Sequence, residues 1–337
     1  MGHRSTASGL RRSGCMGMFT YLDELYLSGA QIWIDARKPR PCAFISHAHS
    51  DHTGRHGQIL ATAETLLLCR RRLGSRPGHV LGYGQPLAWR EVHLTAWPAG
   101  HVLGSAMLHV RQGTQSLLYT GDFRLRTART CPPAQPVHAD VLIMECTYGH
   151  PRYRFPDRRE VEEQVVRDIR QALRLRYTPV ILAYSLGKAQ EIQHFLEEAG
   201  LPVMVHPSIA RINEVYRSQG ISLGSWHNWD PTRCRGCVCL VPPACRRRKY
   251  LLELPRPLLL QLTGWALDRY AHVRLGVDRV YPYSDHADFD ELLQMVRRVA
   301  PKTVYCTHGP AEFVRHLIAD GWDARRLGAA SYQQALF

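Results

Sequence analysis

The stretch FISHAHSDHTGRH, residues 44–56, sets histidines and an aspartate at short intervals directly after an apolar segment. The preceding letters CAFIS predict a buried strand, and SDHTGR carries turn and helix-start signals, so these polar side chains follow a strand end. The spacing lets His47 and His49 point to one centre, with Asp51 and His52 following where the chain turns. Imidazole with carboxylate is the ligand mixture of Zn²⁺ and Mn²⁺ sites. The stretch therefore predicts a metal centre, because a histidine-rich tail would lack the strand before it.

The composition is typical of a soluble globular protein with a sizeable core. The chain has 337 residues, of which 45% are hydrophobic and 21% are charged. No apolar run approaches the roughly 18 residues of a membrane span, so no membrane association is expected. Residues 1–17 are basic and lack the apolar core of a signal peptide, and we expect a flexible N-terminus there. Ten cysteines without a secretory signal indicate free thiols in the reducing cytoplasm.

The charge balance points to an anionic partner. The net charge is +14, from 43 basic and 29 acidic residues. Arginine forms runs at 70–72 and, ending in lysine, at 246–249. Such an excess can serve solubility alone, but the forked donors of arginine also favour phosphate-bearing partners. Beside a hydrolytic metal site, the second interpretation indicates nucleic acid.

Four cysteines form a separate cluster in CRGCVCLVPPAC. Cys234, Cys237, Cys239 and Cys245 have the spacing C-x2-C-x-C-x5-C, which suits a structural Zn²⁺. The letters CVCLVPP also read as a strand, whose alternate side chains would face opposite sides of a sheet. Small buried thiols are therefore the alternative to a metal site, and the sequence leaves both open.

The order of predicted elements indicates two structural units. Residues 18–150 read as short strands joined by glycine-rich turns, with one helix expected at 63–73. Residues 151–265 alternate helices and strands and begin with an amphipathic helix at 157–175. After that segment the pattern of strands followed by polar residues returns. We therefore predict an α/β fold in which a sheet domain, 18–150 and 266–337, is split by an inserted α/β cap.

Five further strand ends carry a histidine or a carboxylate. A lone residue of this kind is more often structural than functional. Here, however, each is followed by glycine, a turn or a helix start, and all lie in the same half of the fold as the first cluster. One shared site explains the set, which consists of His101, Asp122, Glu145, His286 and His308.

These residues together resemble a known family. The series from His47 to His308 is similar to the ligand set of the metallo-β-lactamase fold, and Glu145 and His286, separated by an insertion, resemble the β-CASP nucleases of that superfamily. The stretches ECTYGHPRYRFP, YSLGKAQEI and YSDHADFDELL look most like the bacterial DNA ligase-associated exonucleases, relatives of the Artemis-type nucleases. The resemblance covers residues 19–310. It implies a metallo-β-lactamase αββα sandwich with an inserted β-CASP cap at 151–265.

The resemblance implies two divalent metal ions, Zn²⁺ or Mn²⁺. Two cations a few ångströms apart activate a water molecule and neutralise phosphate charge. One ion would be held by His47, His49 and His101. The second would be held by Asp51, His52 and His308, with Asp122 bridging both ions.

The resemblance also assigns the acid–base chemistry. Asp51, Glu145 and His286 are the expected catalytic residues, with His286 oriented or charged by Glu145 and acting as the general acid. The products would be a 5′-phosphate and a 3′-hydroxyl.

A segment of the cap suggests how a strand end is recognised. Ser185, Gly187 and Lys188 would lie at the first turn of a helix, where free backbone N–H groups and a lysine make a phosphate seat. The alternative is a plain helix N-cap by Ser185. A similar stretch lies beside the terminal 5′-phosphate pocket of related repair nucleases, which favours 5′-to-3′ polarity.

The expected function is a metal-dependent nuclease, most readily a 5′-to-3′ DNA exonuclease in DNA repair or end processing, in functional association with a DNA ligase and a helicase. The alternative is a β-CASP ribonuclease that processes RNA. DNA-specific eukaryotic relatives resemble one another in having valine where this chain has His308, and histidine there is more typical of the RNA-cleaving branch. DNA is favoured over RNA, but the choice stays open. A non-catalytic binding module is excluded, because every ligand position is filled.

Overall fold

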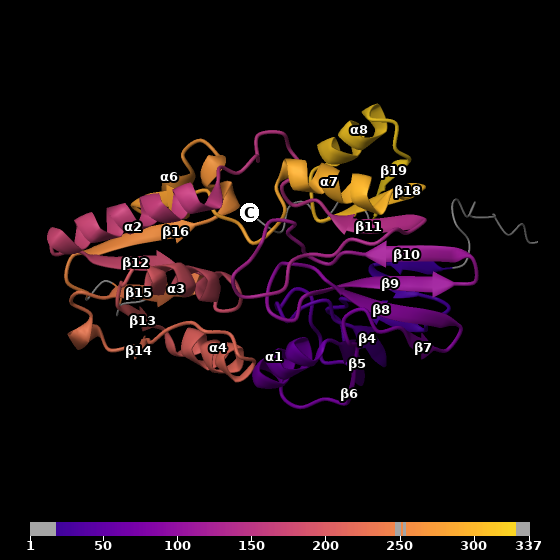
Figure 1. Ribbon diagram of the computed structural model, residues 1–337, viewed down its shortest axis with the longest axis horizontal. Helices are drawn as coiled ribbons and strands as arrows, with labels where there is room; N and C mark the ends of the chain where they lie inside the picture. Colours follow the sequence, from indigo (N-terminus) through magenta and orange to yellow (C-terminus); the bar gives the residue numbers. More distant parts are fainter. Residues whose placement is uncertain (1–17, 247–250, 252–253, 328–337) are drawn as a thin grey trace, which may run out of the picture.

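The computed structural model describes residues 18–246, 251 and 254–327. It has two lobes (Figure 1). The predicted flexible segment 1–17 and most of the basic run 246–249 lie outside the described residues. None of the helices in the described part of the chain combines the length and the apolar character that a membrane crossing needs.

The larger lobe contains two sheets. The first has the strand order β1-β2-β3-β4-β5-β6, with β1 (Phe19–Leu22), β2 (Glu24–Leu27), β3 (Ile32–Ile34), β4 (Cys42–Phe44), β5 (Gln58–Ala61) and β6 (Gly78–Val80). The second has the order β19-β18-β11-β10-β9-β8-β7, with β7 (Leu87–Trp89), β8 (Val92–Pro98), β9 (Ala106–Gln112), β10 (Gln115–Tyr119), β11 (Val141–Glu145), β18 (Thr303–Thr307) and β19 (Ala324–Arg326). Pairs β3–β4, β10–β11 and β11–β18 are parallel. The carboxyl ends of paired parallel strands lie at the same edge of a sheet.

The two sheets pack face to face over one apolar core. This core joins side chains of the first sheet to side chains of the second, among them Ile32, Phe44, Leu60, Leu94 and Leu108. Helices α7 (Phe289–Val299) and α8 (Ala311–Ala319) cover the other face of the second sheet, and α1 (Ala63–Leu73) packs on the first (Figure 1). The layers therefore run helix, sheet, sheet, helix, which confirms the predicted αββα sandwich. Helix α1 has the predicted bounds.

The smaller lobe is built on a third sheet, in which all strands are parallel. Its order is β14-β13-β15-β12-β16-β17, with β12 (Thr178–Leu182), β13 (Val203–Val205), β14 (His227–Asn228), β15 (Val238–Val241), β16 (Pro257–Leu262) and β17 (Arg279–Tyr281). Its central strands are buried along their length, as parallel strands covered on both faces require. This lobe is the α/β cap that the sequence predicts.

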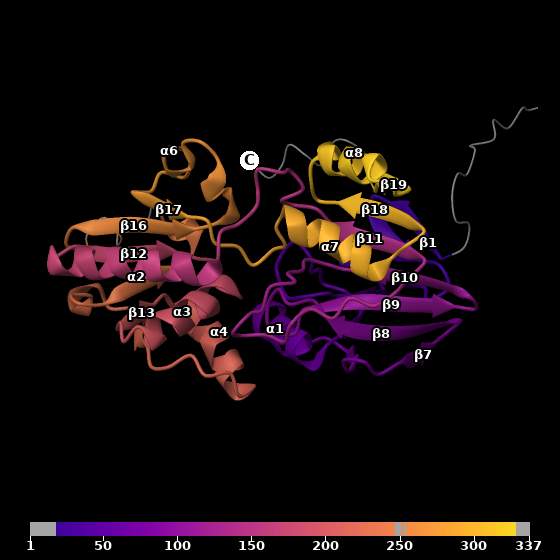
Figure 2. The same ribbon diagram turned by 45° about the horizontal axis from the view of Figure 1, so that its top comes forward.

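Helices lie against the cap sheet (Figure 2). They are α2 (Arg158–Arg174), α3 (Lys188–Glu198), α4 (Pro207–Ser218) and α6 (Ala271–Leu275), with short 3₁₀ turns η1 (Pro231–Arg233), η2 (Pro243–Cys245) and η3 (Gly264–Leu267). Helix α2 begins where the Asp157 side chain accepts hydrogen bonds from the N–H groups of Arg159 and Glu160. Its buried face carries Val165 and Ile169.

The far end of the cap differs from the expected boundary at residue 265. Strand β17 lies beyond that residue, yet it pairs with β16 in the cap sheet. The letters RVY precede polar residues in the same way as the ligand-bearing strands of the sandwich, and this likeness led to the misplaced boundary. The chain leaves the cap sheet after Tyr281, and the division into domains is otherwise a prediction.

The cysteine cluster of the cap lies in an apolar core. Cys234, Cys237 and Cys239 are buried there beside Val180 and Met204. Among the described residues, no group with metal-ligand spacing contains a cysteine. This arrangement favours the buried-thiol interpretation of the cluster.

Candidate metal centre

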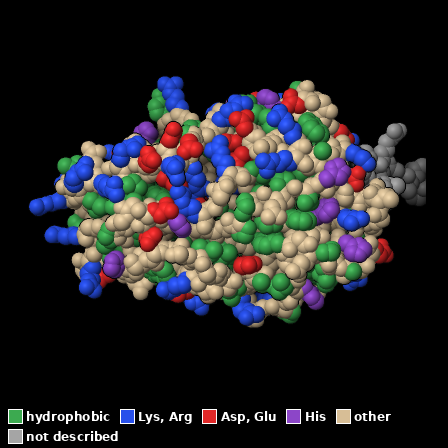
Figure 3. All heavy atoms as spheres, viewed as in Figure 1, with side chains coloured by type: hydrophobic (Ala, Val, Ile, Leu, Met, Phe, Trp, Pro, Cys, Tyr) green, Lys and Arg blue, Asp and Glu red, His purple; other side chains and the backbone are tan. Residues whose placement is uncertain are grey.

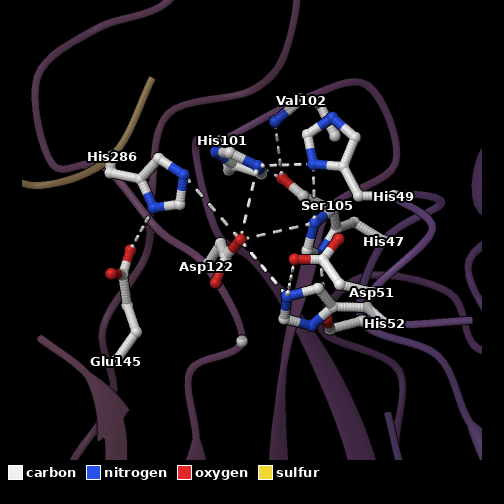
Figure 4. A network of polar contacts seen from close by, with 12 residues as sticks. His47, His49, Asp51, His52, His101, Val102, Ser105, Asp122, Glu145 and His286 are labelled. Atoms are coloured by element: carbon white, nitrogen blue, oxygen red, sulfur yellow. Dashed lines mark hydrogen bonds and ion pairs between the residues drawn. The ribbon is translucent and has the colours of Figure 1, made fainter. Parts of the chain in front are cut away.

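Most of the predicted site residues meet in one network of polar contacts (Figure 4). The first cluster follows β4, and the later residues follow or end β8, β10, β11, β17 and β18. The structure thus brings together His47, His49, Asp51, His52, His101, Asp122, Glu145, His286 and, at its rim, His308.

A tight candidate ligand group consists of His47, His49, His101 and Asp122, whose candidate ligand atoms all lie within 4.8 Å of one another. His49 Nδ1 is 3.0 Å from His47 Nε2 and 3.2 Å from His101 Nε2. Nitrogens bound at about 2.0–2.1 Å to one tetrahedral Zn²⁺ lie about 3.3 Å apart. The donor set therefore fits a divalent metal ion.

The outer nitrogens of these three imidazoles also have partners. His49 Nε2–H donates to the carbonyl oxygen of Leu186 at 3.1 Å, and His101 Nδ1–H donates to that of Asp285 at 2.8 Å. His47 Nδ1 lies 3.0 Å from the hydroxyl of Ser46. Such contacts fix the ring orientation and leave the inner nitrogens free of protons to bind a cation.

Asp122 occupies the middle of the site. Its Oδ2 lies 3.3 Å from His52 Nε2, 3.6 Å from His47 Nε2 and 3.8 Å from His101 Nε2. Burial works against the carboxylate, but the neighbouring imidazoles, His52 first, hold the pKa of Asp122 well below its usual range. A central carboxylate between two groups of imidazoles suits a bridging ligand.

The residues predicted to hold a second ion, Asp51, His52 and His308, lie in a more open part of the site. Asp51 Oδ2 lies 3.8 Å from His52 Nε2, and the Asp51 side chain is 63% exposed. The rings of His52 and His308 have their centroids 5.9 Å apart. Among the described residues, neither Asp51 nor His308 belongs to a group whose ligand atoms lie within 4.8 Å of one another.

Asp35, which the sequence analysis missed, supports this half of the site. Its Oδ2 accepts hydrogen bonds from His52 Nδ1–H at 2.8 Å, from the Tyr119 hydroxyl at 2.8 Å and from Ser46 Oγ at 2.6 Å. Burial lowers the pKa of His52, but the carboxylates of Asp122 and Asp35 outweigh it and raise that pKa well above its usual value. Asp35 ends the letters IWID, so the strand-end pattern that found the other ligands could also have found it.

Glu145 and His286 form a pair at the edge of the ligand group. His286 Nδ1–H donates to Glu145 Oε1 at 2.8 Å, and His286 Nε2 faces Asp122 Oδ2 at 3.9 Å. Burial alone would lower the pKa of His286, but the carboxylates of Glu145 and Asp122 raise it to about 10. The ring can therefore hold a proton beside the metal ligands.

The predicted phosphate seat has a different geometry. Ser185 Oγ lies 2.8 Å from Ser208 Oγ, and Gly187 is the N-cap of α3. The Gly187 N–H donates to Gln190 Oε1 at 2.7 Å. The alternative that Ser185 caps the helix is therefore wrong.

Lys188 is also engaged within the protein. Its Nζ lies 3.0 Å from Asp285 Oδ1, both side chains are 7% exposed, and its backbone N–H donates to the carbonyl of Leu186 at 3.2 Å. The predicted seat requires free N–H groups and a free ammonium, and these donors are already paired. The geometry thus gives no support to Ser185, Gly187 and Lys188 as substrate contacts.

The chain is similar to several known proteins. Residues 270–326 match the Zn-dependent metallo-hydrolase RNA specificity domain. The chain is 40% identical over 308 residues to a protein of Opitutus terrae named “Probable DNA ligase”, covering 90% of this chain and 30% of the relative. It is 29% identical over 276 residues to the 5′ exonuclease Apollo of Gallus gallus, covering 77% of this chain and 57% of that protein. The chain thus spans less than two thirds of the length of either relative.

A solved structure supports the fold. The crystal structure of a protein of unknown function from Enterococcus faecalis V583 has a TM-score of 0.57 and 17% sequence identity, covering 86% of this chain and 79% of that one. This likeness concerns the fold alone. Taken together, the αββα sandwich, the inserted cap, the gathered His and Asp residues and these similarities indicate the β-CASP nuclease family of the metallo-β-lactamase fold.

Proposed function

We propose that this protein is a metal-dependent phosphodiesterase that degrades DNA from the 5′ end, in DNA repair or end processing. The observation that carries the proposal is the Glu145–His286 pair, which places a proton-bearing imidazole 3.9 Å from the central ligand Asp122. Hydrolysis of a phosphodiester needs both charge neutralisation and a proton for the leaving oxygen, and this site combines the residues for both.

The metal ligands are proposed as two sets that share one carboxylate. When bound, two divalent ions, Zn²⁺ or Mn²⁺, supply Lewis-acid activation of water and neutralise phosphate charge. His47, His49 and His101 would hold one ion; Asp51, His52 and His308 would hold the other, and Asp122 would bridge them. The exposure of Asp51 and His308 fits the side of the site on which substrate arrives.

His286 is proposed as the general acid. Glu145 holds its Nδ1 and favours the charged ring, so the proton on Nε2 faces the metal ligands. As the bond between phosphorus and the 3′ oxygen breaks, His286 gives that proton to the departing oxygen. The products are a 5′-phosphate and a 3′-hydroxyl.

Nucleic acid is proposed to lie between the sandwich and the cap. The first connection between the lobes carries Arg152 and Arg154, whose side chains are 54% and 53% exposed. On the face of the molecule that Figure 3 shows, Lys and Arg side chains, mixed with acidic ones, gather toward the middle. Together with the net charge of +14, this distribution favours a polyanionic substrate.

A second candidate is a ribonuclease of the same family. The match of residues 270–326 to a domain described by RNA specificity favours it, as does the presence of His308. We place DNA first because of the similarity to a protein named as a DNA ligase. That similarity also motivates a proposed association with a DNA ligase. A helicase is proposed as a further partner from the resemblance to the ligase-associated exonucleases alone, and the free cysteines favour the reducing cytoplasm.

The test compares linear 5′-phosphorylated single strands of DNA and RNA of one sequence, with Mn²⁺ or Zn²⁺ added. We expect DNA to be shortened from its 5′ end, with His286→Ala as the matched control against a contaminating nuclease. Faster cleavage of RNA would favour the second candidate. Equal cleavage of circular and linear DNA would show that the protein is an endonuclease and not an exonuclease. If neither DNA nor RNA is hydrolysed, both candidates are refuted.

A further inference from the structure

A buried ion pair links the cap to the segment that carries His286. Lys188, the first residue of α3, is 6% exposed, and Asp285, in the connection from β17 to α7, is 5% exposed. Their charged atoms lie 3.0 Å apart. Charges this deeply buried are costly unless paired, so removing one partner leaves the other without compensation.

The same two segments supply the carbonyl groups that orient the metal-site histidines. Leu186, two residues before the lysine, accepts from His49, and Asp285 itself accepts from His101 through its backbone oxygen. Two of the three imidazoles in the tight ligand group thus take their ring orientation from outside the sandwich.

Close packing holds the lysine segment against the His101 loop. Gly187 has a φ of +86°, and a Cβ atom there would lie 2.2 Å from Val102 Cγ1, so a larger residue could not occupy this turn. Further along α3, Glu191 Oε1 accepts from the backbone N–H groups of Arg129 at 3.0 Å and Thr130 at 2.8 Å. The pair therefore belongs to a rigid contact between the lobes.

The carboxylate of Asp285 is close enough to other imidazoles to be considered a ligand itself. His101, Asp285 and His286 bring ligand atoms within 4.8 Å of one another. The Asp285 carboxylate, however, lies 3.0 Å from the Lys188 ammonium. The atom of Asp285 that contacts His101 is its backbone carbonyl oxygen. The arrangement suits a support for the ligands.

We propose that the Lys188–Asp285 pair positions the metal ligands: it fixes the two carbonyls that set the rings of His49 and His101, and it does not bind the substrate. The proposal rests on the metal site of the proposed function, though not on nucleic acid being its substrate. Losing a group that orients a metal ligand costs about 10–100-fold in metal affinity, and the pair holds two such carbonyl groups in place.

The experiment measures Zn²⁺ affinity of the full chain by competition with a chromophoric chelator, without nucleic acid. Lys188→Met and Asp285→Asn should each weaken the affinity about 10–100-fold. The double variant should lose less than the product of the two single losses, because both disrupt one pair. Lys302→Met is the matched control, since Lys302 pairs with Asp140 at 2.8 Å on the sandwich with its side chain 83% exposed, and it should leave the affinity unchanged.

Thermal unfolding in excess chelator separates positioning from general damage. If Lys188→Met does not fold, Asp285→Asn carries the test, because it keeps the side-chain size and the backbone carbonyl. An affinity within twofold of the wild type for a folded variant would overturn the proposal. So would a loss confined to the preference for 5′-phosphate ends, which would restore Lys188 as a substrate contact. A wild type that binds Zn²⁺ tightly but cleaves no nucleic acid would refute the proposed function and leave this test intact.

Discussion

Replacing His286 by alanine should slow the chemical step while leaving the metal ligands in place. His286 Nδ1 is held by Glu145 at 2.8 Å and its Nε2 lies 3.9 Å from Asp122 Oδ2, so the ring faces the tight ligand group without belonging to it. A positioned general acid contributes about 10²–10⁴ in rate. The single-turnover rate of His286→Ala should fall by that factor, which corresponds to about 2.7–5.5 kcal/mol of transition-state stabilisation.

The assay that isolates the proton uses two substrates that differ in one bridging atom. In the first the leaving group is the natural 3′ oxygen; in the second it is a 3′ sulfur, whose thiol has a pKa of about 8.5 and which needs no proton to depart. His286→Ala should cleave the sulfur substrate at close to the wild-type rate and the oxygen substrate far more slowly. Equal losses on both substrates would refute the role of His286 as the acid, and unchanged metal content would exclude an indirect effect.

Four further outcomes follow from the same geometry. Protein purified without chelator should contain about two metal ions per chain. Among variants of the proposed ligands, Asp122→Asn should lower that metal content most, because Asp122 lies between both ligand groups. Full activity with a single ion would contradict this expectation. Asp35→Asn should weaken metal binding about 10-fold or more, because the variant loses the carboxylate that accepts the hydrogen bond from His52. An unchanged metal affinity in chelator competition would show that Asp35 is not needed for metal binding. Affinity for DNA should fall steeply between about 50 and 200 mM salt, whereas a salt-independent affinity would assign the positive charge to solubility. The hydrogen bonds from Lys302 and then Ser116 lower the pKa of Asp140 to about 2. The stabilising contribution of the Asp140 carboxylate is therefore present above the usual pKa of about 4 and is lost as the pH falls toward 2. The unfolding free energies of wild type and Asp140→Asn should accordingly differ at pH 7 and converge toward pH 2.

The residues that gather at the site could be predicted because they obey a local rule. Parallel strands such as β10, β11 and β18 end at one edge of a sheet, so residues that end or follow them, such as Glu145 and Asp122, meet in space although they are distant in sequence. The apolar letters before His47 and the periodicity of 63–73 are equally local signals. Each of these elements could be predicted because the pattern of apolar and polar residues that marks it lies within its own sequence.

The parts that escaped prediction depend on how the lobes dock. Whether the Lys188 ammonium is free or paired depends on Asp285, which the fold brings to it from the other end of the cap insertion. The hydrogen bond from His49 to the Leu186 carbonyl involves a backbone atom, so no side-chain motif reveals it. The last cap strand, β17, has three residues, and so short a sequence does not predict which sheet the strand joins.

The contacts between the lobes also bear on how the site binds metal. Glu191 of α3 accepts from the backbone of Arg129 and Thr130, and the hydroxyl of Tyr216 in α4 accepts from the Leu103 N–H at 3.2 Å. Neither contact uses a residue of the proposed ligand sets, so neither needs a bound ion to form. The cap can therefore stay docked in the absence of metal, with the Leu186 carbonyl of the cap and the Asp285 carbonyl of the β17–α7 connection already facing the histidines. An ion then meets imidazoles whose orientation has been set by folding, and less of its binding free energy is consumed in ordering them.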